Sequence, residues 1–193
     1  EVHQYNQVMS SKISLVYALG LDWVFRTQAK TKNHLAVDLA CGPGYYTLCL
    51  AKYLDYDEVV GIDLSESMLE TAEQNAQAHR LANRICFRKE DLLNLSIKAA
   101  SVDLSSFTNA SHHLSNLQNV TCALLEMERI TKPDGLIMVM DLARLKTRAL
   151  TDQYVEFIGH DYTERGLPQF YESFHNSMLA AWTPQELRSA IPQ

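Results

Sequence analysis

The sequence predicts an α/β fold built on a doubly wound, Rossmann-like, mostly parallel sheet, and three observations lead to this prediction. Five short apolar segments alternate with stretches of helical spacing, which is the pattern of βαβ units around a buried sheet. The first apolar segment runs directly into the loop Gly42-Pro43-Gly44. The second ends at an acidic residue, Asp63, 21 residues after Gly42. Together these features predict a sheet that binds a nucleotide-like cofactor.

The composition is that of one globular domain. The chain has 193 residues, of which 47% are hydrophobic and 21% are charged. A formal net charge of -6 provides no overall attraction to nucleic-acid phosphates, so a nucleic-acid partner is disfavoured and a small molecule is expected. No apolar run approaches the roughly 18 residues of a membrane span, so no membrane partner is expected.

The four cysteines are scattered without a CxxC pair, so no metal site is predicted. They are Cys41, Cys49, Cys86 and Cys122. Cys86 and Cys122 lie in apolar patterns and are predicted to be buried free thiols. Free thiols favour a reducing compartment, so a cytoplasmic location is expected.

The helices and strands follow from periodicity and capping signals. Apolar residues at helical spacing from about Tyr5 to Arg26 predict a helix in two pieces, broken near Gly20. The predicted strands are residues 35–40, 59–63, 85–88, 102–107 and 136–141. The predicted helices run from the loop to about Tyr53, from about Glu66 to His79 after the N-cap Ser65, and from about Leu117 to Ile130. Residues 132–135 have the composition of a turn into the fifth strand.

Beyond Leu142 the chain is predicted to be helical throughout. Two helices are expected over 147–160 and 167–181, and a third begins with Thr183 as N-cap and Pro184 as its first residue. We therefore expect one domain with three parts: an N-terminal helical segment (1–33), a cofactor-binding core (34–142) and a helical cap with C-terminal helices (143–193).

The loop after the first strand has the chemistry of a cofactor site. Gly42 and Gly44 allow the backbone to turn tightly and approach a ligand, and the following helix directs its positive dipole end there. The carboxylate of Asp63 can accept hydrogen bonds from both hydroxyls of a ribose. A dinucleotide fingerprint would need a third glycine where Thr47 stands, which argues against NAD.

Five segments in order resemble the motifs of the class I S-adenosylmethionine (SAM)-dependent methyltransferases. Residues 37–44 are similar to the first motif, with Ala40 in place of the usual first glycine. Residues 61–69 resemble the second, 89–92 the end of the third strand, 107–114 the His-His-Leu segment after the fourth, and 125–136 the helix and turn before the fifth.

The resemblance implies a SAM cofactor and an in-line methyl transfer to an acceptor. Asp63 would bind the ribose, Met68 would lie against the adenine, and Asp91 would accept from the adenine amino group. The implied cofactor-binding residues are Asp38, Ala40, Cys41, Gly42, Gly44, Asp63, Leu64, Met68, Asp91, Leu92 and Asn109. Holding a nucleophile in line can lower the barrier by roughly 7–11 kcal/mol without a covalent residue or metal.

If the methyl acceptor must lose a proton, the reaction needs a general base. His112 and His113 are the predicted catalytic residues, Asp141 is a further candidate, and His160 and His175 lie on the predicted cap helices. The segment 109–112 replaces the Asn/Asp-Pro-Pro-aromatic element of the methyltransferases that act on base amines. A small-molecule acceptor is therefore expected.

Three other functions stay open: an NAD-dependent oxidoreductase, an aminopropyltransferase, and a non-catalytic SAM-binding or scaffold module. The family sheet ends in a sixth and a seventh strand, which are expected to be absent because no further apolar segment follows residue 141. An uncovered sheet edge would favour pairing with a second copy of the chain, as a homo-oligomer.

Overall fold

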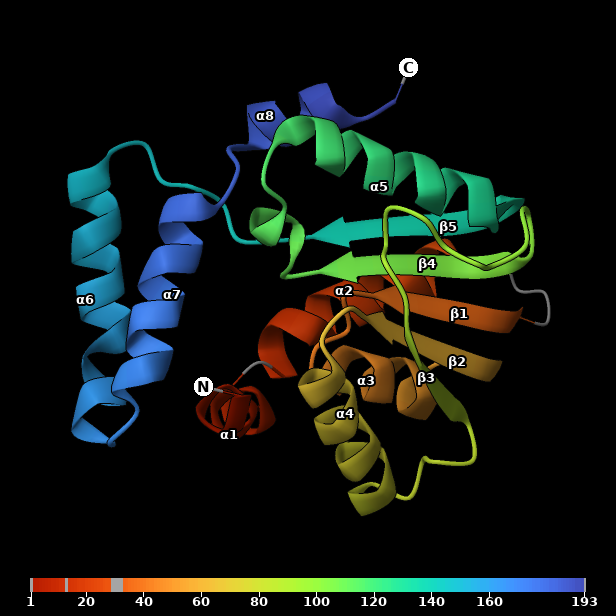
Figure 1. The fold of residues 1–193 in the computed structure, drawn as a ribbon, viewed down its shortest axis with the longest axis horizontal. Coiled ribbons are helices and arrows are strands. Elements are labelled where there is room, and N and C mark those ends of the chain that lie inside the picture. The colour runs from red at the N-terminus through yellow and green to blue at the C-terminus, as the bar shows by residue number, and fades with distance from the viewer. Residues whose placement is uncertain (1, 13, 29–32, 193) are drawn as a thin grey trace.

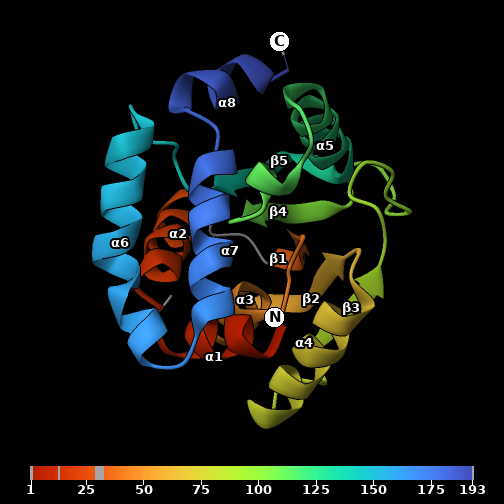
Figure 2. The same ribbon diagram turned by 60° about the vertical axis from the view of Figure 1, so that its left-hand side comes forward.

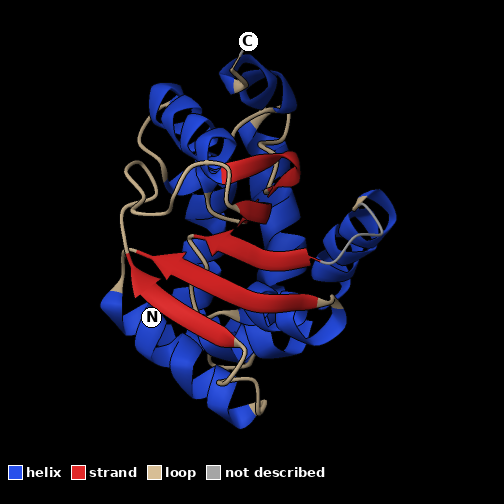
Figure 3. Ribbon diagram, turned by 90° about the vertical axis from the view of Figure 1, so that its right-hand side faces the viewer, coloured by secondary structure: helices blue, strands red, loops and turns tan. Residues whose placement is uncertain are grey.

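A single parallel sheet organises the computed structural model, which describes residues 2–12, 14–28 and 33–192. The strands are β1 (Asn33–Leu39), β2 (Tyr56–Asp63), β3 (Ile85–Lys89), β4 (Val102–Thr108) and β5 (Thr131–Met140). They pair in the order β3-β2-β1-β4-β5, and every pair is parallel. Figure 3 shows the sheet with its covering helices. The predicted Rossmann-like α/β fold is confirmed.

Helices cover both faces of the sheet, as Figure 1 shows. One face carries α2 (Ser14–Thr27), α3 (Tyr45–Tyr53) and α4 (Glu66–Ala78), and the other carries α5 (Leu117–Ile130) and α8 (Pro184–Ala190). Each face has its own apolar core, one around Tyr46 and Tyr56 and the other around Phe107 and Met127. The inner strands are apolar on both sides because neither side meets water.

Three of these helices begin where the sequence predicted, and two of them begin at a predicted N-cap. The side chain of Ser65 accepts from the backbone N–H of Met68, and α4 begins at Glu66, directly after Ser65. Thr183 and Glu186 form a reciprocal capping box at the start of α8. α5 has the predicted bounds.

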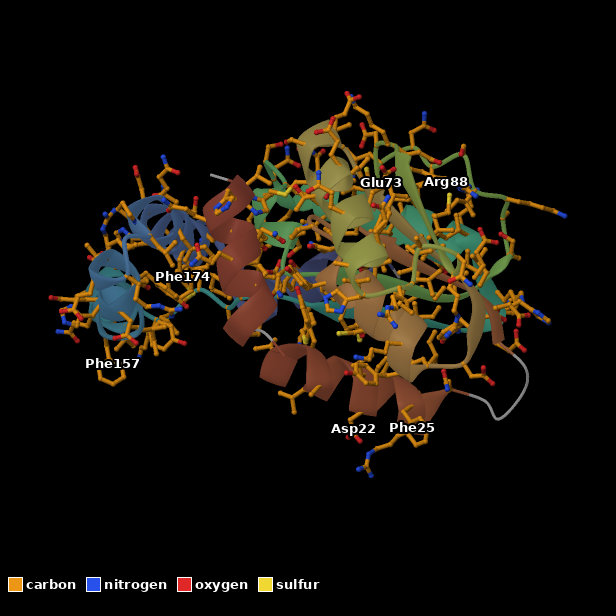
Figure 4. The ribbon with its side chains drawn as sticks, turned by 90° about the horizontal axis from the view of Figure 1, so that it is seen from below. Asp22, Phe25, Glu73, Arg88, Phe157 and Phe174 are labelled. Carbon is orange, nitrogen blue, oxygen red and sulfur yellow. The ribbon has the colours of Figure 1, made fainter. Side chains whose placement is uncertain are left out.

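A group of helices stands at the carboxyl ends of the strands. It consists of α1 (Val2–Lys12), α6 (Arg148–Glu164) and α7 (Pro168–Ala180), while the short 3₁₀ helix η1 (Ser111–His113) follows β4 (Figures 1 and 2). α6 and α7 pack closely at Gly159, where a Cβ atom would lie 2.5 Å from the ring of Tyr171. In Figure 4, Phe157 projects from α6 away from the rest of the molecule.

Two local predictions about the chain path are wrong. Gly20 does not break the N-terminal helix but lies inside α2, where a Cβ would come within 3.2 Å of the Tyr46 hydroxyl. Its small size serves helix packing. The turn-like residues 132–135 lie inside β5, which begins at Thr131 and bulges where Val102 and Leu104 pair with Thr131 and Leu136.

The predicted burial of two cysteines is also wrong. Cys86 is exposed, because β3 is the edge strand of the sheet, and Cys122 is only half-buried beside the apolar stripe of α5. The buried cysteine is Cys41 in the cofactor loop. All four cysteines are free thiols, so the free state predicted for Cys86 and Cys122 is confirmed.

The part of the chain after β5, residues 141–192, contains helices and no strand. Ile137 and Val139 of β5 are each 38% exposed. Among the described residues, no helix is long and apolar enough to cross a membrane. No group of three or more His, Cys, Asp or Glu side chains in the same described ranges is placed to hold a metal ion.

Candidate functional site

The loop between β1 and α3 turns through three left-handed residues. Ala40, Gly42 and Gly44 have φ angles of 50°, 53° and 79°. β1 lies between β2 and β4, so this loop leaves the sheet where the strand order reverses, which is where such sheets bind ligands. A Cβ on Gly44 would lie 3.0 Å from the Cβ of Ala72, whereas a Cβ on Gly42 would meet nothing within 4 Å. The loop is thus packed against α4 on one side and open at Gly42.

Asp63 joins the ends of β1 and β2. Its carboxylate accepts from the backbone N–H of Gly42 at 2.8 Å and from that of Ser65 at 2.9 Å. A carboxylate has about four acceptor positions, so two stay available for the hydroxyls of a diol. The predicted spacing of loop and acid is therefore realised as a direct contact.

Asp38 is fully buried beneath the loop. Its two oxygens accept from the hydroxyls of Thr47 on α3 at 2.7 Å and Ser106 on β4 at 2.9 Å. Burial raises the pKa of Asp38 to about 6, although these two hydrogen bonds oppose the rise. The carboxylate cross-links three elements, and an influence of Asp38 on a cofactor stays a prediction. Sequence reasoning missed both hydroxyl partners.

The six remaining predicted cofactor residues fall into three pairs. Met68 is half-buried at the start of α4. Asn109 directly follows β4, has φ 52° and lines the cavity described below. Leu64 is 65% exposed, and Asp91 is exposed with one oxygen accepting from the N–H of Leu93 in a turn.

Two others lie in apolar surroundings. Leu92 is half-buried and packs against the apolar core that α5 covers. The thiol of Cys41 lies against Gly61, and burial raises the pKa of this thiol well above its usual value. We therefore expect Cys41 to be unreactive. Contacts of Leu92 and Cys41 with a cofactor stay predictions.

An apolar cavity of about 300 Å³ lies at the carboxyl ends of β4 and β5, between these strand ends and the cap. Its walls come from α1, α2, α6, α7 and the ends of β4 and β5. Aromatic side chains dominate it, namely Tyr5, Tyr154, Tyr162, Phe170 and Phe174. A largely apolar pocket with few polar groups is the usual form of a small-molecule site. These residues lie far apart in the chain, and only helical periodicity marked them in the sequence.

The polar feature of this cavity is a buried histidine–aspartate pair. His112 Nδ1 lies 2.7 Å from Asp141 Oδ1, and the two side chains are 3% and 1% exposed. The other carboxylate oxygen accepts from the backbone N–H of His112 and the hydroxyl of Ser111. Burial alone would raise the pKa of Asp141, but these hydrogen bonds and the charge of His112 hold it below its usual value.

The pairing sets the roles of the two imidazole nitrogens. When Asp141 is ionised and His112 is neutral, Nδ1 carries the imidazole proton and Nε2 is left as an acceptor. His113 also lines the cavity, but it is exposed, and its ring stacks 4.2 Å from that of His112. His160 and His175 pair with Glu164 and Asp152 instead and do not line the cavity.

The η1 turn that carries His112 is fixed from the C-terminal side. The indole N–H of Trp182 donates to the carbonyl of Ser111 at 2.9 Å. Arg144 pairs with Glu186 at 2.7 Å, and its backbone N–H donates to the carbonyl of Trp182. The link between α7 and α8 thus holds the histidine in place.

The strand order, the loop of three left-handed residues and the acid at the end of β2 define a class I methyltransferase type of domain. Residues 36–135 match the family described as methyltransferase domain, and the chain belongs to this family. The predicted family is confirmed, and the dinucleotide oxidoreductase reading loses its basis.

The curated relatives are methyltransferases. The chain is 30% identical over 139 residues to a demethylmenaquinone methyltransferase of Lactiplantibacillus plantarum, covering 69% of this chain and 57% of the relative. It is 27% identical over 146 residues to a 2-phytyl-1,4-naphtoquinone methyltransferase of Trichormus variabilis, covering 69% and 62%. The chain thus spans a little over half the length of these relatives.

Solved structures share the fold at lower identity. A putative S-adenosyl-L-methionine-dependent methyltransferase of Methanococcus maripaludis matches with a TM-score of 0.66 and 21% identity, covering 92% of this chain and 81% of its own. The geranyl diphosphate C-methyltransferase of Streptomyces coelicolor, solved with S-adenosyl-L-homocysteine, matches with a TM-score of 0.62 and 14% identity, covering 97% and 64%.

Proposed function

We propose that this domain transfers a methyl group from SAM to a small, largely apolar acceptor that carries an ionisable hydroxyl group. The observation that carries this proposal is the buried His112–Asp141 pair in the wall of an apolar cavity at the carboxyl ends of β4 and β5, the same edge of the sheet from which the cofactor loop leaves β1. An apolar cavity favours an apolar acceptor body, and the buried histidine–aspartate pair in its wall favours a reacting polar group at that point.

The residues of the loop region fit SAM. Bound SAM supplies a methyl group on a sulfonium, which is already an electrophile. Asp63 would accept from the two ribose hydroxyls, since two of its acceptor positions remain after Gly42 and Ser65. The amino-terminal end of α3 favours the carboxylate of the methionine part. Met68 and Asp91 would flank and bind the adenine, as the family resemblance implies.

His112 would act as the general base toward the acceptor. Its Nε2 would take the hydroxyl proton while Nδ1 stays bonded to Asp141, whose negative charge stabilises the imidazolium that forms. General-base catalysis of this kind contributes about 10²–10⁴-fold. The surrounding aromatic side chains would exclude water and hold the acceptor in line.

The names of the relatives indicate which acceptors to test first. Several are named for naphthoquinones or demethylmenaquinone. The reduced form of such a ring has aromatic hydroxyls, which fits both the apolar walls and the histidine base. We therefore propose an aromatic hydroxyl compound as the acceptor class, with methylation at the oxygen or at an adjacent ring carbon.

Isothermal titration with SAM, S-adenosylhomocysteine and NAD tests the cofactor. Binding of the first two but not of NAD is expected, and Asp63→Ala should abolish it while leaving the thermal unfolding transition in place. Binding of NAD alone would overturn the proposal.

Methyl transfer is then measured with 1,4-naphthoquinol and with naphthalene, which has the same ring system but no hydroxyl. Transfer to the quinol alone is expected. SAM binding without transfer to any hydroxylated aromatic compound would favour the scaffold function.

A further inference from the structure

One side chain on α4 connects the cofactor loop to the N-terminal helix. The amide nitrogen of Asn75 lies 2.9 Å from the carbonyl oxygen of Pro43 and 2.9 Å from Oδ1 of Asn6. Pro43 stands between the two left-handed glycines of the loop, and Asn6 lies on α1. A side-chain amide has two N–H donors, so both are engaged by these two partners.

Helix α1 forms part of the acceptor cavity. Tyr5, the neighbour of Asn6, lines the cavity, and its ring lies 5.9 Å from that of Phe170 on α7. The side chain of Gln4 accepts from the backbone N–H of Phe170 at 3.2 Å. α1 is thus held at one side by α7 of the cap and at the other by Asn75.

Tyr5 lies near two carboxylates, that of Asp141 at the acceptor cavity and that of Asp63 at the cofactor site. Burial, together with the charges of Asp141 and Asp63, raises the pKa of Tyr5 to about 12. The ring therefore lies within electrostatic range of the carboxylate beside the acceptor cavity and of the carboxylate of the cofactor site. A movement of α1 would alter the wall between them.

We infer that Asn75 is a positioning residue that couples the cofactor loop to the closure of α1 over the acceptor cavity. This inference rests on the proposed function, because it takes SAM as the ligand of the loop. Asn75 fixes the peptide between Pro43 and Gly44 with one donor and α1 with the other. Fixing the loop by a ligand therefore favours the closed α1, and by reciprocity the closed α1 favours the ligand.

A second contact between α4 and the loop involves no hydrogen bond. Ala72, one turn before Asn75 on the same helix, packs against the Cα of Gly44 and can donate no hydrogen bond. Leucine at position 75 would keep the branching of the side chain at Cγ and favour the helix more strongly, but it would remove both donors. Alanine at position 6 would remove only the connection to α1.

Hydrogen–deuterium exchange of α1, with and without S-adenosylhomocysteine, tests the coupling together with SAM titration. In the wild type, the ligand should slow exchange of the α1 amides. Asn75→Leu should speed their exchange in the free protein, abolish the ligand effect and weaken SAM binding about two- to tenfold, the range of one net hydrogen bond. Asn6→Ala should likewise abolish the ligand effect on α1, with a smaller loss of SAM affinity.

Gln74→Leu is the matched control, since Gln74 is the exposed amide next to Asn75 on α4, and it should behave like the wild type. Unchanged ligand protection of α1 in Asn75→Leu would overturn the inference while leaving the proposed function intact. Failure of the wild type to bind either nucleoside would overturn the proposed function and the inference with it.

Discussion

His112 and Asp141 form a hydrogen-bonded pair, 2.7 Å between Nδ1 and Oδ1, although 29 residues separate them in the chain. The parallel pairing of β4 with β5 brings the ends of the two strands together, because Thr108 is the register partner of Met140. η1 then turns His112 back over Asp141. This pair makes the acceptor cavity a candidate catalytic site as well as an apolar hollow.

Asp141→Asn should lower kcat for a hydroxylated acceptor by about 10²–10⁴-fold, because the amide cannot stabilise a charged imidazole and can favour the wrong tautomer. SAM affinity should change less than about twofold, the size of a weak indirect effect. Steady-state kinetics and SAM titration measure the two quantities. His160→Gln is the control, since His160 is exposed, does not line the cavity and should retain most of the activity. Equal losses in the two variants would contradict the assigned base.

Asp38→Asn should change how stability depends on pH. The pKa of Asp38 is about 6 in the folded chain against an ordinary value of 3.8. Because the folded pKa is raised, this group favours folding fully below pH 4, and that contribution is lost as the pH rises to about 6. Its size is about 3 kcal/mol by linkage.

Urea unfolding of wild type and Asp38→Asn at pH 4, 5, 6 and 7 measures this effect. The free-energy difference between the two proteins should shift in favour of the variant as the pH rises. The comparison cancels carboxylates such as Asp103, whose lowered pKa acts in the opposite direction. A difference that is flat with pH would rule out a raised pKa for Asp38.

Ala40→Gly should stabilise the domain by about 0.5–1 kcal/mol. Ala40 has φ 50°, which costs a residue with a Cβ roughly 1–2 kcal/mol, while glycine loses about 0.5–1 kcal/mol of that gain through chain entropy. Urea unfolding measures the change. Ala36→Gly in β1 is the matched control, because Ala36 is fully buried in ordinary strand conformation and should be destabilised. A loss of stability in Ala40→Gly would show that the loop is not strained there.

Gly61→Ala should destabilise the domain by about 1–3 kcal/mol, the usual cost of overpacking. A Cβ at this position in β2 would lie 2.6 Å from the ring of Phe87 and 3.0 Å from the sulfur of Cys41. Phe87→Leu in the Gly61→Ala background should recover part of the loss by making room. Thermal unfolding of the single and double variants measures the coupling, and simple additivity of the two changes would contradict the proposed clash.

The local signals in the sequence were sufficient for the fold. Alternating apolar segments and helical stretches predicted five parallel strands, and the N-caps Ser65 and Thr183 marked the helix starts correctly. These signals are reliable because periodicity and capping depend on near neighbours in the chain. The errors arose where packing outweighed local preference. Gly20 serves a contact with Tyr46, and Pro133 with Gly135 forms a bulge inside β5.

The sequence by itself determined the five strands. It also determined the loop from Asp38 to Gly44 and its spacing to Asp63, because these residues lie on one βαβ unit. Only the tertiary structure decided which histidine is buried, that Asp141 is its partner, and that Asn75 joins Pro43 to Asn6. It also placed the aromatic residues of α1, α6 and α7 around one cavity. The physical reason is that these contacts depend on strand order and helix packing, which bring distant residues together and leave no periodic mark in the chain.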